Sequence, residues 1–320
     1  MNSVITFSPA HTVVPTYECF NRCSYCNFRV SPGRGTFLAR IDILNILQKL
    51  DYQKIAEVLV LSGEVHPASE RRAEWFTKVQ EVCEVALVHG FLPHTNVGPL
   101  SWQEMKQLKK VNVSMGLMLE QLNPKFMRTV HQHAPSKDPK LRLQQLEWAG
   151  KLKIPFTTGL LLGIGETNAD IEESLKAIAL VHRRSGNIQE VILQPHSMGS
   201  QQASELPSFP PERLPSIIAQ AKKILPSEVA IQIPPNLVPE PNFLLECLAA
   251  GATDLGGISP VDEVNPDYSH PTYESLSAIL EPAGWHLKPR LPVHSHYYSW
   301  LSPSLQKAVK AKEKSLIWKN

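Results

Sequence analysis

The chain has 320 residues, 42% of them hydrophobic, and a formal net charge of +2 at pH 7. This composition can bury a large core, and the near-neutral charge gives no electrostatic reason to expect a nucleic acid or a membrane surface as partner. The sequence has no run of 18 or more apolar residues and no secretory signal at residues 1–7, so we expect no membrane span and a cytoplasmic protein.

Short β-rich runs alternate with longer amphipathic segments along the chain. In chain order, strands are predicted at 12–16, 57–61, 91–95, 111–117, 156–162, 190–194, 229–233 and 253–258. Helices are predicted at 41–50, 73–89, 141–151, 170–184, 211–225, 241–250 and 273–283. Pro211 and Pro241 fit helix starts, and Gly90, Gly251 and Gly284 fit helix ends.

Eight strands alternating with helices imply parallel pairing through right-handed crossovers. The predicted fold is therefore α/β, a TIM-like (β/α)₈ barrel with its site at the carboxyl ends of the strands. An open, partial (β/α)₆ barrel with an appended tail is the alternative. We find no internal repeat or linker, so residues 1–320 are interpreted as one domain. Residues 291–320 are interpreted as a C-terminal tail with an amphipathic helix at 304–312.

The five cysteines are unevenly distributed. Cys83 and Cys247 are isolated in apolar helix-like stretches and are interpreted as small core residues. Cys19, Cys23 and Cys26 lie close together directly after the first predicted strand, which in a reducing compartment indicates a metal site rather than disulfides.

The spacing of these three cysteines favours an iron–sulfur cluster with one open iron. Zinc sites and ferredoxin clusters usually take four protein ligands, whereas no fourth cysteine is near. Three thiolates would leave one iron of a 4Fe–4S cluster free to bind a cosubstrate. The alternative is a structural zinc site with a histidine such as His11 as fourth ligand, but zinc sites favour paired spacings.

The Cys-x₃-Cys-x₂-Cys spacing, with Tyr25 just before the last cysteine, resembles the signature of the radical S-adenosylmethionine superfamily. The resemblance implies that S-adenosylmethionine binds the fourth iron and is reductively cleaved to a 5′-deoxyadenosyl radical. Ser62-Gly63-Glu64 is similar to the element that receives the methionyl ammonium group in this superfamily. The alternative interpretation of this short segment is an ordinary turn.

Two further segments resemble parts of the cosubstrate site in the same superfamily. Residues 159–166 match a Gly-x-Ile-x-Gly-x-x-Glu pattern, with Leu161 in place of isoleucine, and would place Gly163 and Glu166 near the adenosine. The apolar run 191–194, including Ile192, would flank the adenine. A glycine-dependent loop and plain barrel core are the respective alternatives.

A longer set of segments extends the resemblance over nearly the whole chain. These segments are 92–96, 114–120, 155–159, 188–192, 234–237, 254–260 and 289–293. In order and spacing they are similar to the CofG subunit family of 7,8-didemethyl-8-hydroxy-5-deazariboflavin synthases. The resemblance implies a carbon–nitrogen (ammonia) lyase that closes the third ring of the deazaflavin and releases ammonia, 5′-deoxyadenosine and methionine.

The implied substrate is the hydroxybenzyl-dihydrouracil adduct of tyrosine and 5-amino-6-(D-ribitylamino)uracil, made by a companion tyrosine-coupling subunit. That subunit would bind stably or only transiently, and a one-electron reductant such as flavodoxin or ferredoxin is required. Other members of the superfamily, including the companion subunit itself and sulfur inserters of the biotin synthase type, are the first alternative. A scaffold protein with a purely structural cluster is the second.

Polar residues in these segments are the candidates for handling the adduct. Substrate contacts are predicted for Asn96, Gln194, Asn236 and Ser259, and acid or base roles for His94, Glu120 and His196. The run 194–197 departs from the Asn-Phe-Arg-Ala-Lys type of sequence that members of the family often carry, so basic substrate contacts there are in doubt. The pairs His131/His133 and His294/His296 lack nearby carboxylates in sequence and are interpreted as solvated loop residues.

Overall fold

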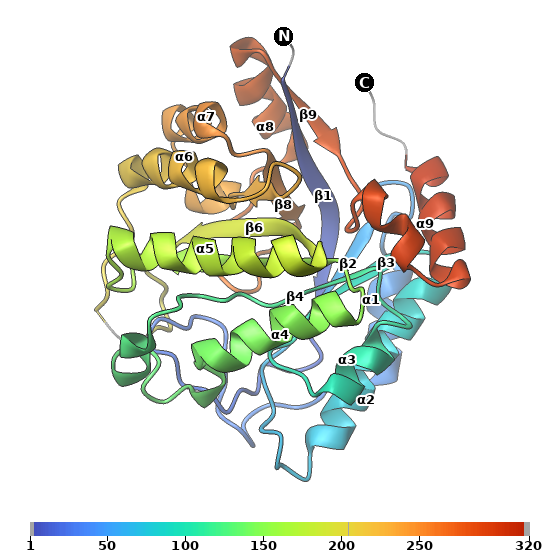
Figure 1. The fold of residues 1–320 in the computed structure, drawn as a ribbon. Coiled ribbons are helices and arrows are strands. Elements are labelled where there is room, and N and C mark those ends of the chain that lie inside the picture. The colour runs from blue at the N-terminus through green and yellow to red at the C-terminus, as the bar shows by residue number, and fades with distance from the viewer. Residues whose placement is uncertain (1–2, 204, 317–320) are drawn as a thin grey trace.

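Eight parallel strands close into a barrel, and helices surround it (Figure 1). The computed structural model describes residues 3–203 and 205–316. The barrel strands are β1 (Ser3–Val13), β2 (Glu57–Leu61), β3 (Leu92–Asn96), β4 (Ser114–Gly116), β5 (Phe156–Leu162), β6 (Ile188–Pro195), β7 (Ala230–Gln232) and β8 (Asp254–Ile258). Pairing of β1 with both β2 and β8 closes the ring, which confirms the (β/α)₈ prediction and excludes the partial barrel.

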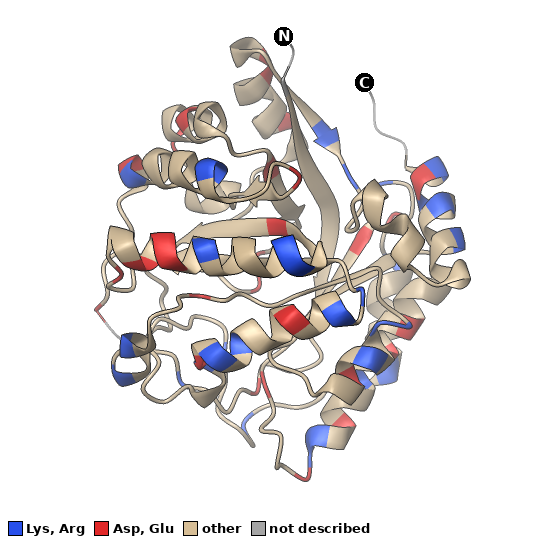
Figure 2. Ribbon diagram, viewed as in Figure 1, with Lys and Arg blue, Asp and Glu red and all other residues tan. Residues whose placement is uncertain are grey.

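Among the described residues are the seven helices predicted around the barrel, the helix predicted at 304–312 and one further helix. The helices are α1 (Arg40–Gln48), α2 (Arg72–Val88), α3 (Trp102–Leu108), α4 (Pro139–Lys151), α5 (Asn168–Ser185), α6 (Leu214–Ile224), α7 (Pro241–Ala250), α8 (Tyr273–Leu280) and α9 (Pro303–Ser315). Helix α3, which has only seven residues, was not predicted from the sequence. Its signal is a capping box between Ser101 and Glu104. Basic and acidic residues are mixed along the outer helices in the view of Figure 2.

The first strand begins nine residues earlier than predicted and ends at Val13. The polar residues in the first part of β1 do not give the apolar pattern expected of a buried strand. Alternate positions of a barrel strand face the lumen and need not be apolar. One edge of β1 pairs with β8. The other edge pairs with β9 (Trp285–Pro289) along Ser3–Phe7 and then with β2 along Ala10–Val13. Strand β9 was also not predicted from the sequence.

The predicted tail closes the amino-terminal end of the barrel. Leu291, Val293, Tyr297, Leu301, Leu305 and Val309 pack with Ala56, Leu92 and Val113, which lie at or just before the starts of β2, β3 and β4. The Lys312 ammonium group donates to the carbonyl oxygens of Tyr52 (2.9 Å) and Ile55 (3.2 Å) and so ties α9 to the barrel. The helix predicted at 304–312 is α9, and the described residues of the predicted tail pack as part of the core. Within the described chain, no helix is both long and apolar enough to cross a membrane.

Candidate functional site

A cavity of about 340 Å³ runs through the lumen of the barrel from the cysteine loop at the mouth to Arg290 and Pro292 below. The two-residue period of the strands decides which side chains reach it. On β2 the lumen receives Glu57, Leu59 and Leu61, and on β6 it receives Glu190, Ile192 and Gln194. Because all eight strands are parallel, their first residues lie at the floor and their last residues at the mouth.

The cysteine loop follows β1 and is held against neighbouring strand-end loops by backbone hydrogen bonds. Within the segment after β1, the amide of Cys19 donates to the carbonyl oxygen of Val30 (3.0 Å). The amide of Phe20 donates to the carbonyl oxygen of Glu64 (2.9 Å) after β2. The amides of Arg22 and Ser24 donate to the carbonyl oxygens of His133 (2.7 Å) and Val130 (3.0 Å) after β4. These bonds place Cys19, Cys23 and Cys26 at the mouth of the cavity, as the sequence predicts.

The donor set at the mouth fits an iron–sulfur cluster better than a single ion. In the described part of the chain, no three His, Cys, Asp or Glu side chains are gathered closely enough to hold one metal ion. A cubane cluster does not need such gathering, because each thiolate binds a different iron. Burial raises the pKa of the free Cys23 thiol to about 12, so we expect iron binding to be coupled to loss of its proton. His11, the alternative zinc ligand, lines a separate small pocket beside Tyr17.

Glu64 is held in place beside the cysteine loop. Its carboxylate accepts hydrogen bonds from Asn21 Nδ2 (3.0 Å), from Ser136 Oγ and from Arg142 Nη2 (3.4 Å). Only glycine fits at the preceding position 63, because a Cβ atom there would lie 2.2 Å from the Glu18 carbonyl oxygen. Ser62, Gly63 and Glu64 all line the cavity, where these hydrogen bonds fix the position of the Glu64 carboxylate.

Glu120 lies at the same level and pairs with two cations that sequence reasoning missed. Lys137 contacts its carboxylate directly, and Arg142 Nη1 lies 3.7 Å away. Burial favours a higher pKa for Glu120, but the charges of Lys137 and Arg142 outweigh it and lower the pKa below the usual value. Glu120 has a φ of 65°, a left-handed conformation that is uncommon for a residue other than glycine. Its backbone bridges to β5 at Leu160.

Tyr25 and two histidines form one wall of the mouth. The Tyr25 hydroxyl lies 2.9 Å from His131 Nε2, and the ring of His196 stands edge-on to Tyr25 at 6.4 Å between centroids. Burial and the nearby Lys137 charge lower the pKa of His131 to about 3, so this ring is neutral. The prediction that His131 is solvated was wrong, because only 2% of its surface is exposed. His196 lines the cavity, with Nδ1 3.0 Å from the Pro207 carbonyl oxygen and Nε2 3.1 Å from Gln202.

Of the other predicted cosubstrate and substrate residues, Ile192, Asn96 and Gln194 line the cavity and four do not. The Glu166 carboxylate accepts from the amides of Gly163 (2.6 Å) and Ile164, which stabilises the turn after β5. Asn236 donates to Asp262 (2.8 Å) in the loop after β8, and Ser259 lines the separate small pocket. The roles of Gly163, Glu166, Asn236 and Ser259 stay predictions.

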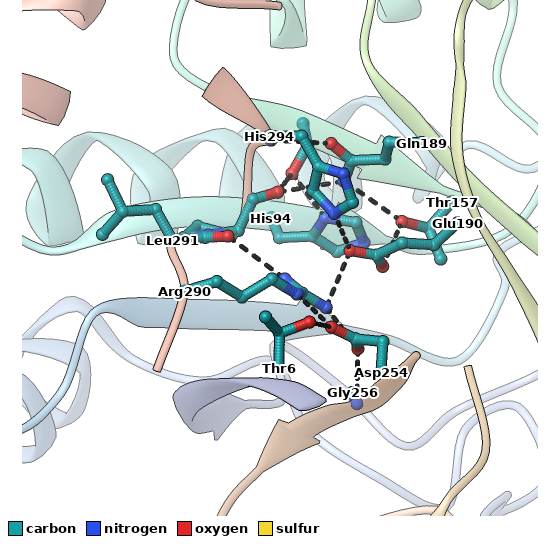
Figure 3. Close-up of polar contacts among 12 residues, drawn as sticks. Thr6, His94, Thr157, Gln189, Glu190, Asp254, Gly256, Arg290, Leu291 and His294 are labelled. Atoms are coloured by element: carbon teal, nitrogen blue, oxygen red, sulfur yellow. Dashed lines mark hydrogen bonds and ion pairs between the residues drawn. The ribbon is translucent and has the colours of Figure 1, made fainter. Parts of the chain in front are cut away.

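The floor of the cavity is a charged network that sequence reasoning did not anticipate (Figure 3). Arg290, in the segment after β9, pairs with Glu190 of β6 and Asp254 of β8. Thr157 donates to Glu190 (3.0 Å), and His294 Nε2 lies 2.9 Å from the same carboxylate. The interpretation of His294 as solvated and without carboxylate company was therefore wrong.

His94, a predicted acid or base, also lies at this floor. Its Nδ1 is 2.7 Å from Ser114 Oγ, and burial lowers its pKa to about 4, so the ring is neutral. The sequence held one signal for the floor residues that were not predicted, namely a charged residue inside an otherwise apolar strand. Glu57 and Glu190 both show it.

Comparisons with known proteins identify the superfamily and support the fold. Residues 13–178 match the model of the radical SAM superfamily. Among solved structures, the [FeFe]-hydrogenase maturase HydG from Carboxydothermus hydrogenoformans superposes with a TM-score of 0.74 at 16% identity. That superposition covers 96% of this chain and 77% of HydG, and at this identity it supports the fold alone.

Two cyanobacterial relatives are much more similar in sequence, and both are named 7,8-didemethyl-8-hydroxy-5-deazariboflavin synthase. The protein from Trichormus variabilis is 60% identical over 96% of this chain and 90% of its own length. The protein from Nostoc sp. is 57% identical over 99% of this chain and 94% of its own length. The chain belongs to the radical SAM superfamily and, within it, to the 7,8-didemethyl-8-hydroxy-5-deazariboflavin synthase family.

Proposed function

We propose that this protein is a radical SAM lyase that closes the third ring of the 8-hydroxy-5-deazaflavin chromophore from the hydroxybenzyl-dihydrouracil adduct. Ammonia, 5′-deoxyadenosine and methionine are released. The observation that carries the proposal is a single cavity that joins the three cysteines at the mouth to a closed lumen below them. Family membership and this continuity together favour chemistry on a small molecule inside the barrel.

Two groups of residues prepare the mouth for the cofactors. Cys19, Cys23 and Cys26 would hold a 4Fe–4S cluster, beside which S-adenosylmethionine would bind. Glu64, oriented by Asn21 and Arg142, receives the methionyl ammonium group. When bound, these cofactors supply a 5′-deoxyadenosyl radical that removes a hydrogen atom from the substrate.

The middle of the lumen holds the rings of the substrate. Leu59, Leu61, Leu117, Leu161 and Ile192, here called the apolar belt, line the cavity between mouth and floor. Apolar side chains favour flat aromatic and pyrimidine rings, and they exclude water that would compete for protons. Asn96 and Gln194 also line the cavity and supply amide groups for uracil oxygens or nitrogens.

Glu120 is the proton acceptor that we favour among the three predicted acids and bases. The Lys137 and Arg142 charges keep its carboxylate ionised, and it lines the cavity at the level of the cysteines. His94 lies at the floor, far down the strands from the cysteines, and is neutral. His196 lines the mouth and is the second candidate.

Two external partners follow from the reaction. A one-electron reductant such as flavodoxin or ferredoxin is needed to start each cleavage, and the companion tyrosine-coupling subunit supplies the adduct. Thiols that must remain free to bind iron favour the reducing cytoplasm as the location.

The test is anaerobic turnover with the preformed adduct. The reduced, iron-reconstituted enzyme is expected to form the fluorescent deazaflavin, ammonia and 5′-deoxyadenosine in step with one another. Consumption of the adduct without deazaflavin would assign the chain to another reaction of the superfamily. A complete lack of 5′-deoxyadenosine would instead support a structural cluster.

A further inference from the structure

The lumen changes in polarity from mouth to floor. Below the apolar belt, its lining becomes polar, and we call Glu57, His94, Thr157, Glu190, Gln232 and Arg290 the polar floor. Barrels of this type are usually filled at this depth by packed branched apolar side chains. Here the cavity continues downward, and hydrogen-bonding groups surround its end.

Glu57 is the acidic residue of the polar floor that Arg290 does not pair with. The Arg290 guanidinium group contacts Glu190 at 2.7 Å and Asp254 at 2.8 Å (Figure 3), and none of the salt bridges among the described residues includes Glu57. Burial raises the pKa of the Glu57 carboxyl to about 7, although a hydrogen bond with Ser8 and the charge of Arg290 act to lower it. The neutral acid is therefore populated near neutral pH, and it both donates and accepts a hydrogen bond.

Small residues leave space beside Glu57. Ala10 of β1 is its register partner, and a Cβ atom added to Gly257 of β8 would lie 3.3 Å from Ala10 Cβ and 4.0 Å from Glu57 Oε1. All three residues line the cavity. Larger side chains at positions 10 and 257 would fill the floor, so the sequence keeps this end of the lumen open.

We infer that the polar floor is the binding site for the hydroxylated ribityl chain of the substrate, and that Glu57 is a specificity-determining residue there. The inference rests on the proposed function and names the orientation of the substrate in that site. Within the described lining of the floor there is no Phe, Tyr or Trp to stack on a flat ring. Hydroxyl groups along a flexible chain donate and accept hydrogen bonds, as Glu57, Gln232 and Thr157 do.

The depth of the lumen agrees with this orientation. Leu61 lies four residue steps after Glu57 along β2, which spans about 13 Å at the rise of a parallel strand. With the ribityl chain at the floor, the pyrimidine and hydroxybenzyl rings lie in the apolar belt. The benzylic region then faces the mouth, where the cysteines and Glu64 lie.

The experiment compares two substrates in wild type and three variants. One substrate is the natural adduct, and the other carries an ethyl group in place of the ribityl chain. The wild-type enzyme is expected to bind the natural adduct at least tenfold more tightly than the ethyl analogue. Glu57→Leu is expected to remove most of that preference, with about a tenfold higher KM for the natural adduct, because a buried hydrogen-bonding partner is lost. Glu57→Gln, which still donates and accepts, is expected to lose less.

Leu59→Ala, one lumen position higher on the same strand, is the matched control. This variant is expected to weaken the binding of both substrates by the same factor, because it removes packing in the apolar belt and leaves the floor intact. Gly257→Ala provides a second test that leaves Glu57 unchanged. Its added methyl group narrows the floor and should weaken the binding of the natural adduct only. Iron content and S-adenosylmethionine affinity are measured for each variant to show that it is folded.

The outcomes separate this inference from the proposed function. Equal losses for both substrates in Glu57→Leu and in Gly257→Ala, in an enzyme that makes the deazaflavin, would overturn the floor assignment alone. A wild-type enzyme that makes no deazaflavin from either adduct would overturn the proposed function and the floor assignment with it. Loss of preference confined to the floor variants supports both.

Discussion

Arg290 Nη2 lies 2.7 Å from Glu190 Oε1 inside the barrel, although the two residues are 100 positions apart in the sequence. The same guanidinium group binds Asp254 of β8, so one cation from the segment after β9 connects two strands of the barrel. Both carboxylates are buried, and Arg290 is the cation that pairs with both of them. The charge balance at the barrel floor therefore depends strongly on this residue.

Replacing Arg290 by methionine is expected to destabilise the protein by roughly 3–5 kcal/mol, because the buried Glu190 and Asp254 carboxylates would lose the cation that pairs with both. Thermal or urea unfolding of the purified protein measures the change. Arg40→Met is the matched control, since its pair with Glu81 lies on the surface and should contribute about 0–1 kcal/mol. Equal stability of the two variants would show that the floor network does not support the fold.

Glu57 should make stability depend on pH near neutrality. Its pKa is about 7 in the folded protein and 4.5 as the ordinary value, so the unfolded chain loses this proton first as pH rises. The contribution of the protonated acid is complete below pH 4.5 and is lost as pH rises through 7. Glu57→Gln cannot titrate, so its melting temperature relative to wild type should be higher at pH 8 than at pH 5. An unchanged difference between the two pH values would contradict the raised pKa.

Cys23→Ala is expected to abolish cluster assembly and turnover together, since two thiolates cannot hold the cluster in the open-iron arrangement. Iron and sulfide content and the visible absorption of the reconstituted protein measure the loss. Cys83→Ala is the control, because Cys83 is buried against Thr95 and Asn112, away from the cavity. A Cys23→Ala protein with full iron content and turnover would remove Cys23 from the ligand set.

Glu64→Gln should weaken S-adenosylmethionine binding by about tenfold or more while iron content stays unchanged, because a charge-assisted contact with the ammonium group is lost. Equilibrium binding to the reconstituted enzyme measures the affinity. Glu74→Gln on α2 is an exposed control with no expected effect. An affinity equal to that of wild type would show that Glu64 acts only on Asn21, Ser136 and Arg142.

Local patterns predicted most of the barrel correctly. The bounds of β2 and β5 agree with the prediction residue for residue, because both are short, mostly apolar runs of the kind that parallel strands show when both faces are covered. The spacing of Cys19, Cys23 and Cys26 indicated the metal site without any structure, since ligand spacing in one loop is a local property. Positive φ values at Gly90, Gly251 and Gly284 confirm the predicted helix ends.

Only the tertiary structure brought Glu57, Glu190, Arg290, Lys137 and Arg142 to one cavity. The positions of these residues depend on contacts between segments far apart in sequence, which a local periodicity does not record. Strand β9 was not predicted for the same reason, because it pairs with the start of β1. The sequence alone determined that three cysteines follow the first strand of an eight-stranded barrel. Closure of that barrel decided what lies beneath them, because parallel strands place their lumen-facing residues in shared layers only after the ring is complete.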